Sequence, residues 1–141
     1  MDVYDAEKRS AIMRAVKSRD TKPEIKVRQL LHKAGYRYRL HRKDLPGKPD
    51  IVFPSKKVVI FVHGCFWHQH AGCPQAERPA ANSDYWTKKL NRNMERDKTN
   101  IAALTNEGWR TLILWECEIK KGDVLGRVKL FLEALDSHST K

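Results

Sequence analysis

A carboxylate and two histidines stand beside two consecutive predicted strands of this 141-residue sequence. Asp50 opens the strand predicted at 50–53, and His63 and His68 follow the strand predicted at 58–62. A carboxylate at a sheet edge can hold a hard cation such as Mg²⁺, together with a backbone carbonyl, waters and phosphate oxygens. A histidine that titrates near neutral pH can take a proton from water. Asp50 alone is more typical of a turn residue after a proline, and the neighbouring histidines favour the cation site.

Three cysteines and a histidine have the types and spacing of a zinc site. Cys65, His70 and Cys73 lie close together, and Cys117 follows the strand predicted at 109–115. Thiolates and imidazoles suit tetrahedral Zn²⁺, and a set of three cysteines and one histidine fills all four positions, so such a site would be structural. The alternative is three small buried thiols, because an odd cysteine count makes a poor disulfide framework.

Aromatic residues gather next to these ligands. Phe66 and Trp67 are consecutive on a predicted loop, and Tyr85 and Trp86 follow it. Exposed aromatic side chains beside basic residues can stack on bases or wedge between base steps. The alternative is that one of the loop pair packs inward on the sheet. Met13, on a basic predicted helix, is a similar candidate whose alternative is ordinary helix packing.

Hydrophobic periodicity and capping signals predict the elements that position these groups. Their order is α-α-β-β-β-loop-α-β-α, which implies an α/β fold with a mixed sheet and helices on both faces. The predicted elements are a helix at 5–17, a helix from the capping box at 21–24 to Gly35, strands at 36–40, 50–53 and 58–62, an irregular loop at 63–83, a helix at 84–105 with Ser83 as N-cap, a strand at 109–115 and a helix at 124–135.

The long predicted helix carries two polar residues on its apolar stripe. Asn93 and Asp97 fall at helical spacing between Leu90 and Ile101. They lie either at the edge of the stripe, in water, or against a polar pocket, and the sequence favours neither.

Charge indicates a polyanionic partner. The chain carries a net charge of +11, and residues 1–43 hold 13 basic and 5 acidic residues. A basic leading segment on a nearly balanced body favours nucleic acid over a membrane surface, and charge kept for solubility is the alternative. The start of the chain lacks a signal pattern and no run approaches the ~18 apolar residues of a membrane span, so we expect a cytoplasmic protein.

Taken together, these residues resemble the very short patch repair (Vsr) DNA mismatch endonucleases over about residues 5–120. The motif His-Gly-Cys-Phe-Trp-His at 63–68 is the most specific part of the resemblance. Two features depart from the family pattern: Ala71 and Gly72 lengthen the loop, and Gln69 stands within a histidine run. The other matching segments are 13–15, 21–24, 45–50, 59–62, 85–86, 93–97, 108–110 and 114–117.

The resemblance implies one domain over 1–141 with a fold similar to restriction endonucleases and a structural zinc. Residues 1–20 would clamp DNA. Asp50 and the carbonyl of Val62 would bind Mg²⁺, His68 would be the general base, and His63 and Glu24 would assist, Glu24 by orienting the histidine or metal-bound water. The further implied residues are Cys65, His70, Cys73 and Cys117 for Zn²⁺, Met13, Arg14, Phe66, Trp67 and Trp86 for DNA, and Asn93 and Asp97 as active-site neighbours.

The implied activity is a strand-specific, Mg²⁺-dependent nick 5′ to the thymine of a T:G mismatch that arises by deamination of 5-methylcytosine. Phe66, Trp67 and Trp86 would enter from the major groove and Met13 from the minor groove. A mismatched step is cheaper to unstack, so a wedge turns weak stacking into selectivity. We expect a monomer acting on double-stranded DNA, and leave open a repair protein or methylase as a further partner.

Two other functions remain open at this stage. One is a zinc-stabilised module that reads mismatches without catalysis, and the other is a restriction-type nuclease that cuts both strands. Asp50 and both histidines are present, which favours an enzyme over the module. A nick rather than a double-strand break would separate the first enzyme from the second.

Overall fold

The computed structural model describes residues 21–40 and 42–139. The predicted helix at 5–17, with Met13 and Arg14, and the basic segment 1–20 lie outside these residues.

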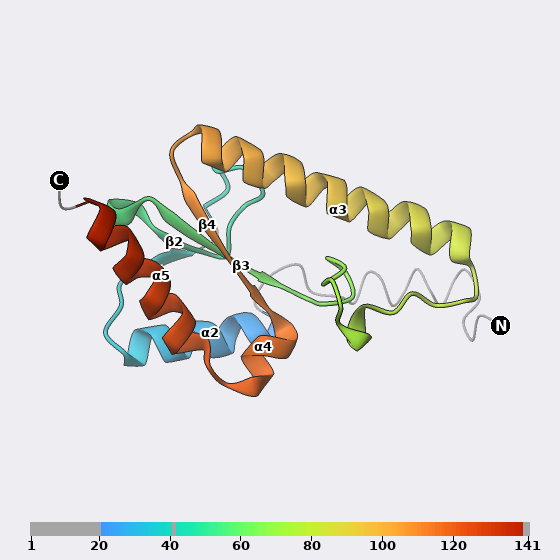
Figure 1. Cartoon of the computed structure of the whole chain (residues 1–141), viewed down its shortest axis with the longest axis horizontal. Coiled ribbons are helices and arrows are strands. Elements are labelled where there is room, and N and C mark those ends of the chain that lie inside the picture. The colour runs from blue at the N-terminus through green and yellow to red at the C-terminus, as the bar shows by residue number, and fades with distance from the viewer. Residues whose placement is uncertain (1–20, 41, 140–141) are drawn as a thin grey trace.

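A four-stranded mixed sheet organises the described residues (Figure 1). Its strands follow one another in the order β1-β2-β3-β4, with the first two pairings antiparallel and the β3–β4 pairing parallel. The expected α/β class with a mixed sheet is therefore confirmed. The elements are α2 (Lys22–Lys33), β1 (Arg39–Leu40), β2 (Ile51–Phe53), β3 (Val58–His63), α3 (Ser83–Asn106), β4 (Arg110–Trp115), α4 (Glu116–Lys121) and α5 (Val124–Ser139), with short 3-10 turns at Pro54–Lys56 and Pro74–Ala76.

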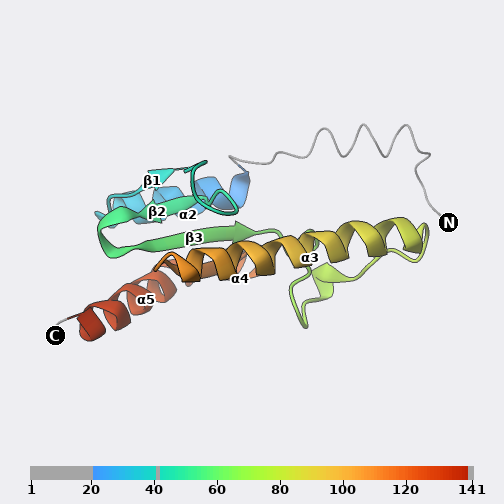
Figure 2. The ribbon, with the colours of Figure 1, turned by 90° about the horizontal axis from the view of Figure 1, so that it is seen from above.

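Helices cover both faces of the sheet, with α2, α4 and α5 on one face and α3 on the other (Figures 1 and 2). Side chains of a strand alternate between the two faces, so β3 contributes to two cores. Val58 and Ile60 pack with α2, α4 and α5, whereas Val59 and Phe61 pack with Leu104 of α3. His63 continues the second series, which places its ring on the side of α3.

α3 extends beyond the strands, and its N-terminal half runs beside the loop that follows β3 (Figure 1). This helix therefore ties two regions together: its C-terminal half belongs to the core, and its N-terminal half lies against the loop that carries the candidate ligands.

A tight turn before β2 fixes the position of Asp50. Gly47 has a φ of 76°, and a Cβ there would lie 3.1 Å from atoms of both Asn100 and Phe61. Lys48 also has a positive φ, at 50°, and its N–H donates to the carbonyl of Leu45 at 3.0 Å. Only glycine allows so close an approach, so the turn sits directly against α3 and β3.

The element boundaries differ from the sequence predictions by one residue at several strand and helix ends, so that His63 is the last residue of β3. The larger corrections are four. The strand predicted at 36–40 shrinks to β1, and before it Tyr36 and Tyr38 pack edge-on against Phe53. The N-cap of α3 is Asn82, with left-handed backbone, rather than Ser83. The last helix ends at 139 rather than 135, and the six-residue helix α4 was not predicted at all.

Candidate functional site

Asp50 stands at the start of β2, directly across from the end of β3. Its N–H donates to the carbonyl of Ile60 at 3.1 Å, which extends the hairpin pairing by one residue. Its Oδ2 accepts a hydrogen bond of 2.6 Å from the N–H of Val62. The hairpin therefore holds the carboxyl group in one orientation beside the last residues of β3.

Glu24 of α2 reaches the same place from the other direction. Its N–H donates to the N-cap oxygen of Thr21 at 3.4 Å, and its carboxylate pairs with Arg28 at 3.1 Å. Glu24 is only 4% exposed. Burial and the neighbouring Glu24 raise the pKa of Asp50 to about 7, against the opposing pull of the Val62 N–H. Two carboxyl groups in one poorly solvated place favour a bound cation, because a cation relieves both their repulsion and their desolvation.

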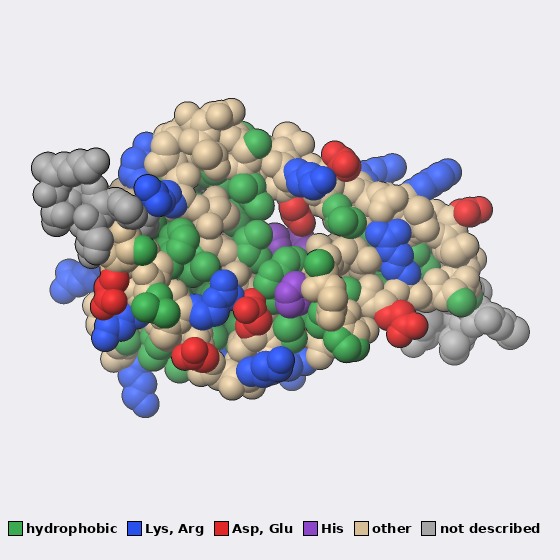
Figure 3. All heavy atoms as spheres, in the orientation of Figure 1, with side chains coloured by type: hydrophobic (Ala, Val, Ile, Leu, Met, Phe, Trp, Pro, Cys, Tyr) green, Lys and Arg blue, Asp and Glu red, His purple; other side chains and the backbone are tan. Residues whose placement is uncertain are grey.

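These carboxyl groups line a pocket of about 520 Å³ between the sheet and α3. Figure 3 shows histidine side chains at a hollow beneath α3, with acidic side chains nearby. Lys43 and Lys48 add positive charge to the lining. The pocket residues that the sequence singled out are Glu24, Asp50, Val62, His63, His68 and Asp97.

His68 and Asp97 form a hydrogen-bonded pair on the α3 side of this pocket. The Nδ1 of His68 lies 2.7 Å from Oδ2 of Asp97. Because a carboxylate can only accept, Nδ1 carries the proton, and Nε2 of a neutral ring keeps a free lone pair. The arrangement can therefore take a proton at Nε2, and Asp97 stabilises the imidazolium that results.

His63 stacks on His68 with ring centroids 3.7 Å apart and an interplanar angle of 6°. It is 5% exposed, and among the described residues its Nδ1 has no hydrogen-bond partner. Burial and the nearby His68 lower the pKa of His63 to about 3, so this ring stays neutral. A neutral ring against one face of His68 keeps that imidazole in place without adding a second charge.

The polar residues on the stripe of α3 face inward. Asp97 binds His68, and Asn93 donates from Nδ2 to the carbonyl of Trp67 at 3.1 Å, directly before His68 in the chain. The structure therefore favours the pocket over the solvated edge for both residues. Asp97, not Glu24, is therefore the partner of Nδ1 of His68, and Glu24 lies beside Asp50.

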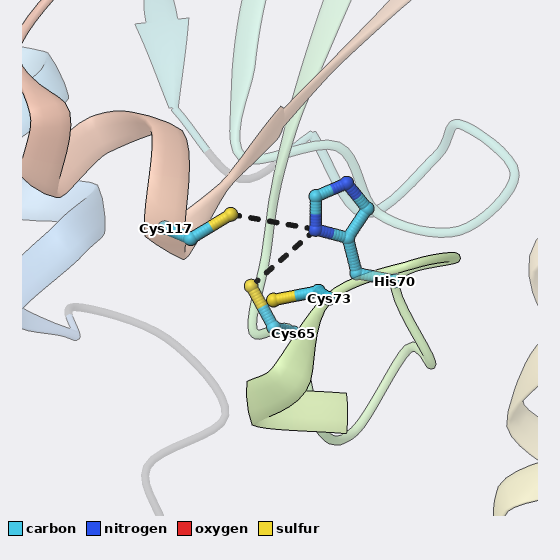
Figure 4. Close-up of side chains that lie close together, drawn as sticks. All are labelled: Cys65, His70, Cys73 and Cys117. Carbon is cyan, nitrogen blue, oxygen red and sulfur yellow. Dashed lines mark hydrogen bonds between the residues drawn. The ribbon is translucent and has the colours of Figure 1, made fainter. Parts of the chain in front are cut away.

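A second group of candidate ligands lies where the loop after β3 meets α4 (Figure 4). Nδ1 of His70 lies 3.7 Å from Sγ of Cys65 and 3.4 Å from Sγ of Cys117. Cys73 completes the group, and the four ligand atoms all lie within 4.8 Å of one another. None of these cysteines forms a disulfide.

This group fits a tetrahedral ion. Zinc bonds of about 2.3 Å to sulfur and 2.0–2.1 Å to nitrogen place neighbouring ligand atoms about 3.6 Å apart, close to the two distances given above. The loop reaches this geometry through tight turns: His70 donates to the carbonyl of Cys65 at 2.9 Å and Cys73 to that of His70 at 3.2 Å. Burial raises the pKa of Cys65 to about 12, so an ion must displace its proton on binding.

The aromatic residues form one cluster between the loop and α3. Trp86 lies 5.4 Å from Phe66 and 6.0 Å from Trp67, centroid to centroid, and Tyr85 lies 5.0 Å from Trp86. None of the four is fully buried. Neither Phe66 nor Trp67 is buried in the core of the sheet, so the cluster presents a partly exposed aromatic surface on the loop that carries His68.

The sequence analysis did not identify two contacts near the site, that of Arg28 with Glu24 and that of Gln69 with Arg78. Arg28 pairs with Glu24, and its spacing of four residues on a predicted helix was the signal for it. Gln69 and Arg78 bond to each other within the loop, at 2.8 Å, and no periodicity marks such a contact.

Comparison with known proteins identifies the class of this chain. The sequence model of the family described as DNA mismatch endonuclease Vsr matches residues 1–75. The chain is 53% identical to the type II nicking enzyme V.XorIIP of Xanthomonas oryzae pv. oryzae over 84% of this chain and 86% of that protein. These matches, together with carboxyl groups and a histidine–aspartate pair in one pocket, define a nuclease.

The particular family is also clear. The chain is 43% identical to the DNA mismatch endonuclease Vsr of Escherichia coli over 95% of this chain and 82% of that protein. It is 43% identical to the type II nicking enzyme V.NmeAIP of Neisseria meningitidis over 84% of both. The chain belongs to the Vsr DNA mismatch endonuclease family, which confirms the resemblance and the expectation of an enzyme.

No helix among the described residues combines the length and the apolar character that crossing a bilayer requires.

Proposed function

We propose that this protein nicks one strand of duplex DNA 5′ to the thymine of a T:G mismatch, as a step of very short patch repair in the cytoplasm. The observation that carries the proposal is the meeting, in one pocket, of the Asp50 and Glu24 carboxyl groups with the His68–Asp97 pair. Phosphodiester hydrolysis needs a charge-stabilising cation and a proton acceptor, and this pocket offers a place for each. We also propose a restriction-endonuclease type of fold.

Mg²⁺ is the proposed catalytic ion, because the donors at Asp50, Glu24 and the backbone of Val62 are all oxygen atoms, which hard cations prefer. When bound there it would stabilise negative charge on the attacked phosphate. Asp50 is held for this task by the Val62 N–H at 2.6 Å. Glu24 is fixed by Arg28 and faces Asp50.

His68 accepts the proton of the attacking water at Nε2. Asp97 keeps the ring in the required tautomer, and the neutral His63 stacks behind it. Lys43 and Lys48, in the pocket lining, suit the negative charge of a DNA strand.

We assign Zn²⁺ to the group of Cys65, His70, Cys73 and Cys117, as a structural ion. The set of three thiolates and one imidazole leaves no open position for water. The ion would anchor the loop that carries His68, Phe66 and Trp67 to α4.

Mismatch reading is assigned to the aromatic cluster of Phe66, Trp67 and Trp86. A partly exposed cluster fixed to α3 can enter a step whose stacking is already weak, and a T:G pair costs less to open than a matched pair. The E. coli relative is named a DNA mismatch endonuclease and the V.XorIIP relative a nicking enzyme, which supports both parts of the proposal.

The test is a nicking assay on end-labelled duplexes that carry each mismatch in turn, with Mg²⁺ and with EDTA. We expect a single cut 5′ to the thymine of T:G, only with Mg²⁺. Asp50→Ala and His68→Ala should abolish the cut and keep binding to the T:G duplex. Full activity of either variant would contradict the mechanism. Binding of the T:G duplex by the wild type without any cut would indicate a module that reads mismatches. In a parallel assay on a plasmid, linear product would indicate a nuclease that cuts both strands.

A further inference from the structure

The candidate metal ligands tie the loop between β3 and α3 to α4, but not to α3. Cys65, His70 and Cys73 all lie in this loop, and their partner Cys117 lies on α4, on the opposite face of the sheet from α3. The partner of His68, however, is Asp97 on α3. An ion bound to α4 cannot by itself set the distance between His68 and α3. Asn93 of α3 holds the backbone directly before His68, through the carbonyl of Trp67 at 3.1 Å. The part of the loop that follows His68 needs its own contact with α3.

Gln69 sits between the two histidines and shapes the loop from inside. Its backbone is left-handed, with a φ of 53°, which turns its two neighbours in different directions. Its amide nitrogen donates to the carbonyls of Phe66 at 2.7 Å and Ala76 at 3.0 Å. Its amide oxygen accepts from Nε of Arg78 at 2.8 Å. The side chain thus joins an early and a late part of the loop, and both hydrogen atoms of its amide group are used in hydrogen bonds.

Arg78 continues this chain of bonds to α3. Its Nη2 donates to Oδ1 of Asn91 at 2.8 Å and lies 3.8 Å from Sδ of Met94. Asn91 and Met94 are on α3, one to two turns before Asp97. Among the described residues Arg78 has no carboxylate partner, so its planar guanidinium is used to join two neutral amides. Two bonds in fixed directions resist sliding of the loop along the helix.

We infer that Arg78 is a positioning residue for the reaction: through Gln69 and Asn91 it holds the loop against α3 so that His68 stays bonded to Asp97. The inference rests on the proposed function for its kinetic consequence, but the bond between His68 and Asp97 can be observed without any DNA. The network is separate from the ion, since none of its three residues is a candidate ligand.

A direct contact between Arg78 and a DNA phosphate is the rival role. That role needs only a positive charge, which lysine supplies, whereas joining two amide oxygens needs the fork of arginine. A phosphate contact also contributes about 0.9 to the slope of log affinity against log salt, and a positioning role contributes nothing.

The experiment compares Arg78→Met, Arg78→Lys, Gln69→Asn and the double variant Gln69→Asn/Arg78→Met in the full chain. Gln69→Asn keeps an amide and tolerates the left-handed backbone but is one methylene too short to reach Arg78. Lys88→Met is the matched control, because it removes one exposed cation of α3 outside the network. Each variant is measured for single-turnover nicking, KM, affinity against salt, metal content and the downfield proton resonance of the His68–Asp97 hydrogen bond.

We expect Arg78→Met to lower kcat about tenfold, because small misplacement of a catalytic group is costly, with KM within about twofold. Arg78→Lys should be no better, and the double variant should lose no more than about twofold beyond either single variant, since the two residues act as a unit. The downfield resonance should broaden or vanish while one equivalent of metal is retained. Lys88→Met should leave the resonance and kcat unchanged.

Three results would overturn the inference. Rescue by Arg78→Lys with a lower salt slope for Arg78→Met would assign Arg78 to a phosphate. Loss of the ion together with activity would make the network merely structural. An unchanged resonance in Arg78→Met would show that His68 is held without it. If the wild type itself fails to nick, the proposed function fails, but the resonance still decides the role of Arg78.

Discussion

The pair of His68 and Asp97 gives the sharpest test of the chemistry. Asp97→Asn replaces one carboxylate oxygen by an amide nitrogen of almost the same size, so the fold and the helix α3 should be unaffected. The hydrogen bond that it removes is 2.7 Å long, and the Asp97 side chain is 23% exposed. A hydrogen bond to a charged group contributes about 1.5–3 kcal/mol, which corresponds to about a 10- to 150-fold change in rate.

The asparagine amide also acts on the tautomer. It can donate to Nδ1 of His68, and the ring proton then moves to Nε2, where the lone pair is needed. General base catalysis supplies about 10²- to 10⁴-fold. We therefore expect kcat to fall by about 10²-fold or more, with KM and affinity for the T:G duplex little changed, because Asp97 makes no contact with DNA in this mechanism.

The assay is single-turnover nicking of a labelled T:G duplex at saturating enzyme, beside a gel-shift titration in Ca²⁺. Glu95→Gln is the matched control: it removes one carboxylate of α3 on an exposed position two residues away. Asp97→Asn with the rate of the wild type, or with a loss wholly in affinity, would refute the assignment of His68 as a base held by Asp97.

Three further predictions concern the ion, the buried carboxyl group and the core. Cys117→Ser should lose the single tightly held metal, measured by elemental analysis, and unfold at a lower temperature, whereas a folded wild type without metal would contradict the zinc assignment. With metal removed, Asp50 keeps a proton up to a pH of about 7 in the folded protein but only to its ordinary 3.8 when unfolded. Its contribution to the free energy of unfolding is therefore full below pH 3.8 and is lost as pH rises through 7, by at most about 4 kcal/mol. In urea titrations, the free energy of unfolding of Asp50→Asn should depend less on pH in this range than that of the wild type. An equally steep dependence in the variant would show that Asp50 does not have the raised pKa. Leu114→Ala, at a fully buried site of the larger core, should cost about 2–5 kcal/mol, and a smaller loss in the same titration would mean that the core refills the cavity.

Most of the fold could be predicted from residue patterns that lie within single helices or strands. The two consecutive strands predicted at 50–53 and 58–62 are β2 and β3, which pair as the hairpin that holds Asp50, and the apolar stripe of α3 predicted which face of that helix is buried. The sequence also showed that Asn93 and Asp97 interrupt this stripe. It could not show that they face a pocket, because that depends on where the loop lies.

What escaped prediction depends on contacts distant in sequence or on segments too short for periodicity. The six residues of α4 make less than two turns and show no stripe. The partner of His68 lies 29 residues away on α3. The bonds of Gln69 come from a left-handed backbone conformation that asparagine or glycine would have indicated but glutamine does not.

The register of β3 against β4 also determines where the candidate ligands Cys65 and Cys117 lie relative to each other. His63 lies opposite Trp115, so the residues that follow each strand, Cys65 and Cys117, start from the same level. A slip of β4 by one residue would shift Cys117 by about 3.3 Å and turn Leu114 to the other face. If the proposed Zn²⁺ binds there, the slipped chain would offer it three ligands instead of four, so the ion would bind the correct alignment of the two parallel strands more tightly than the slipped one.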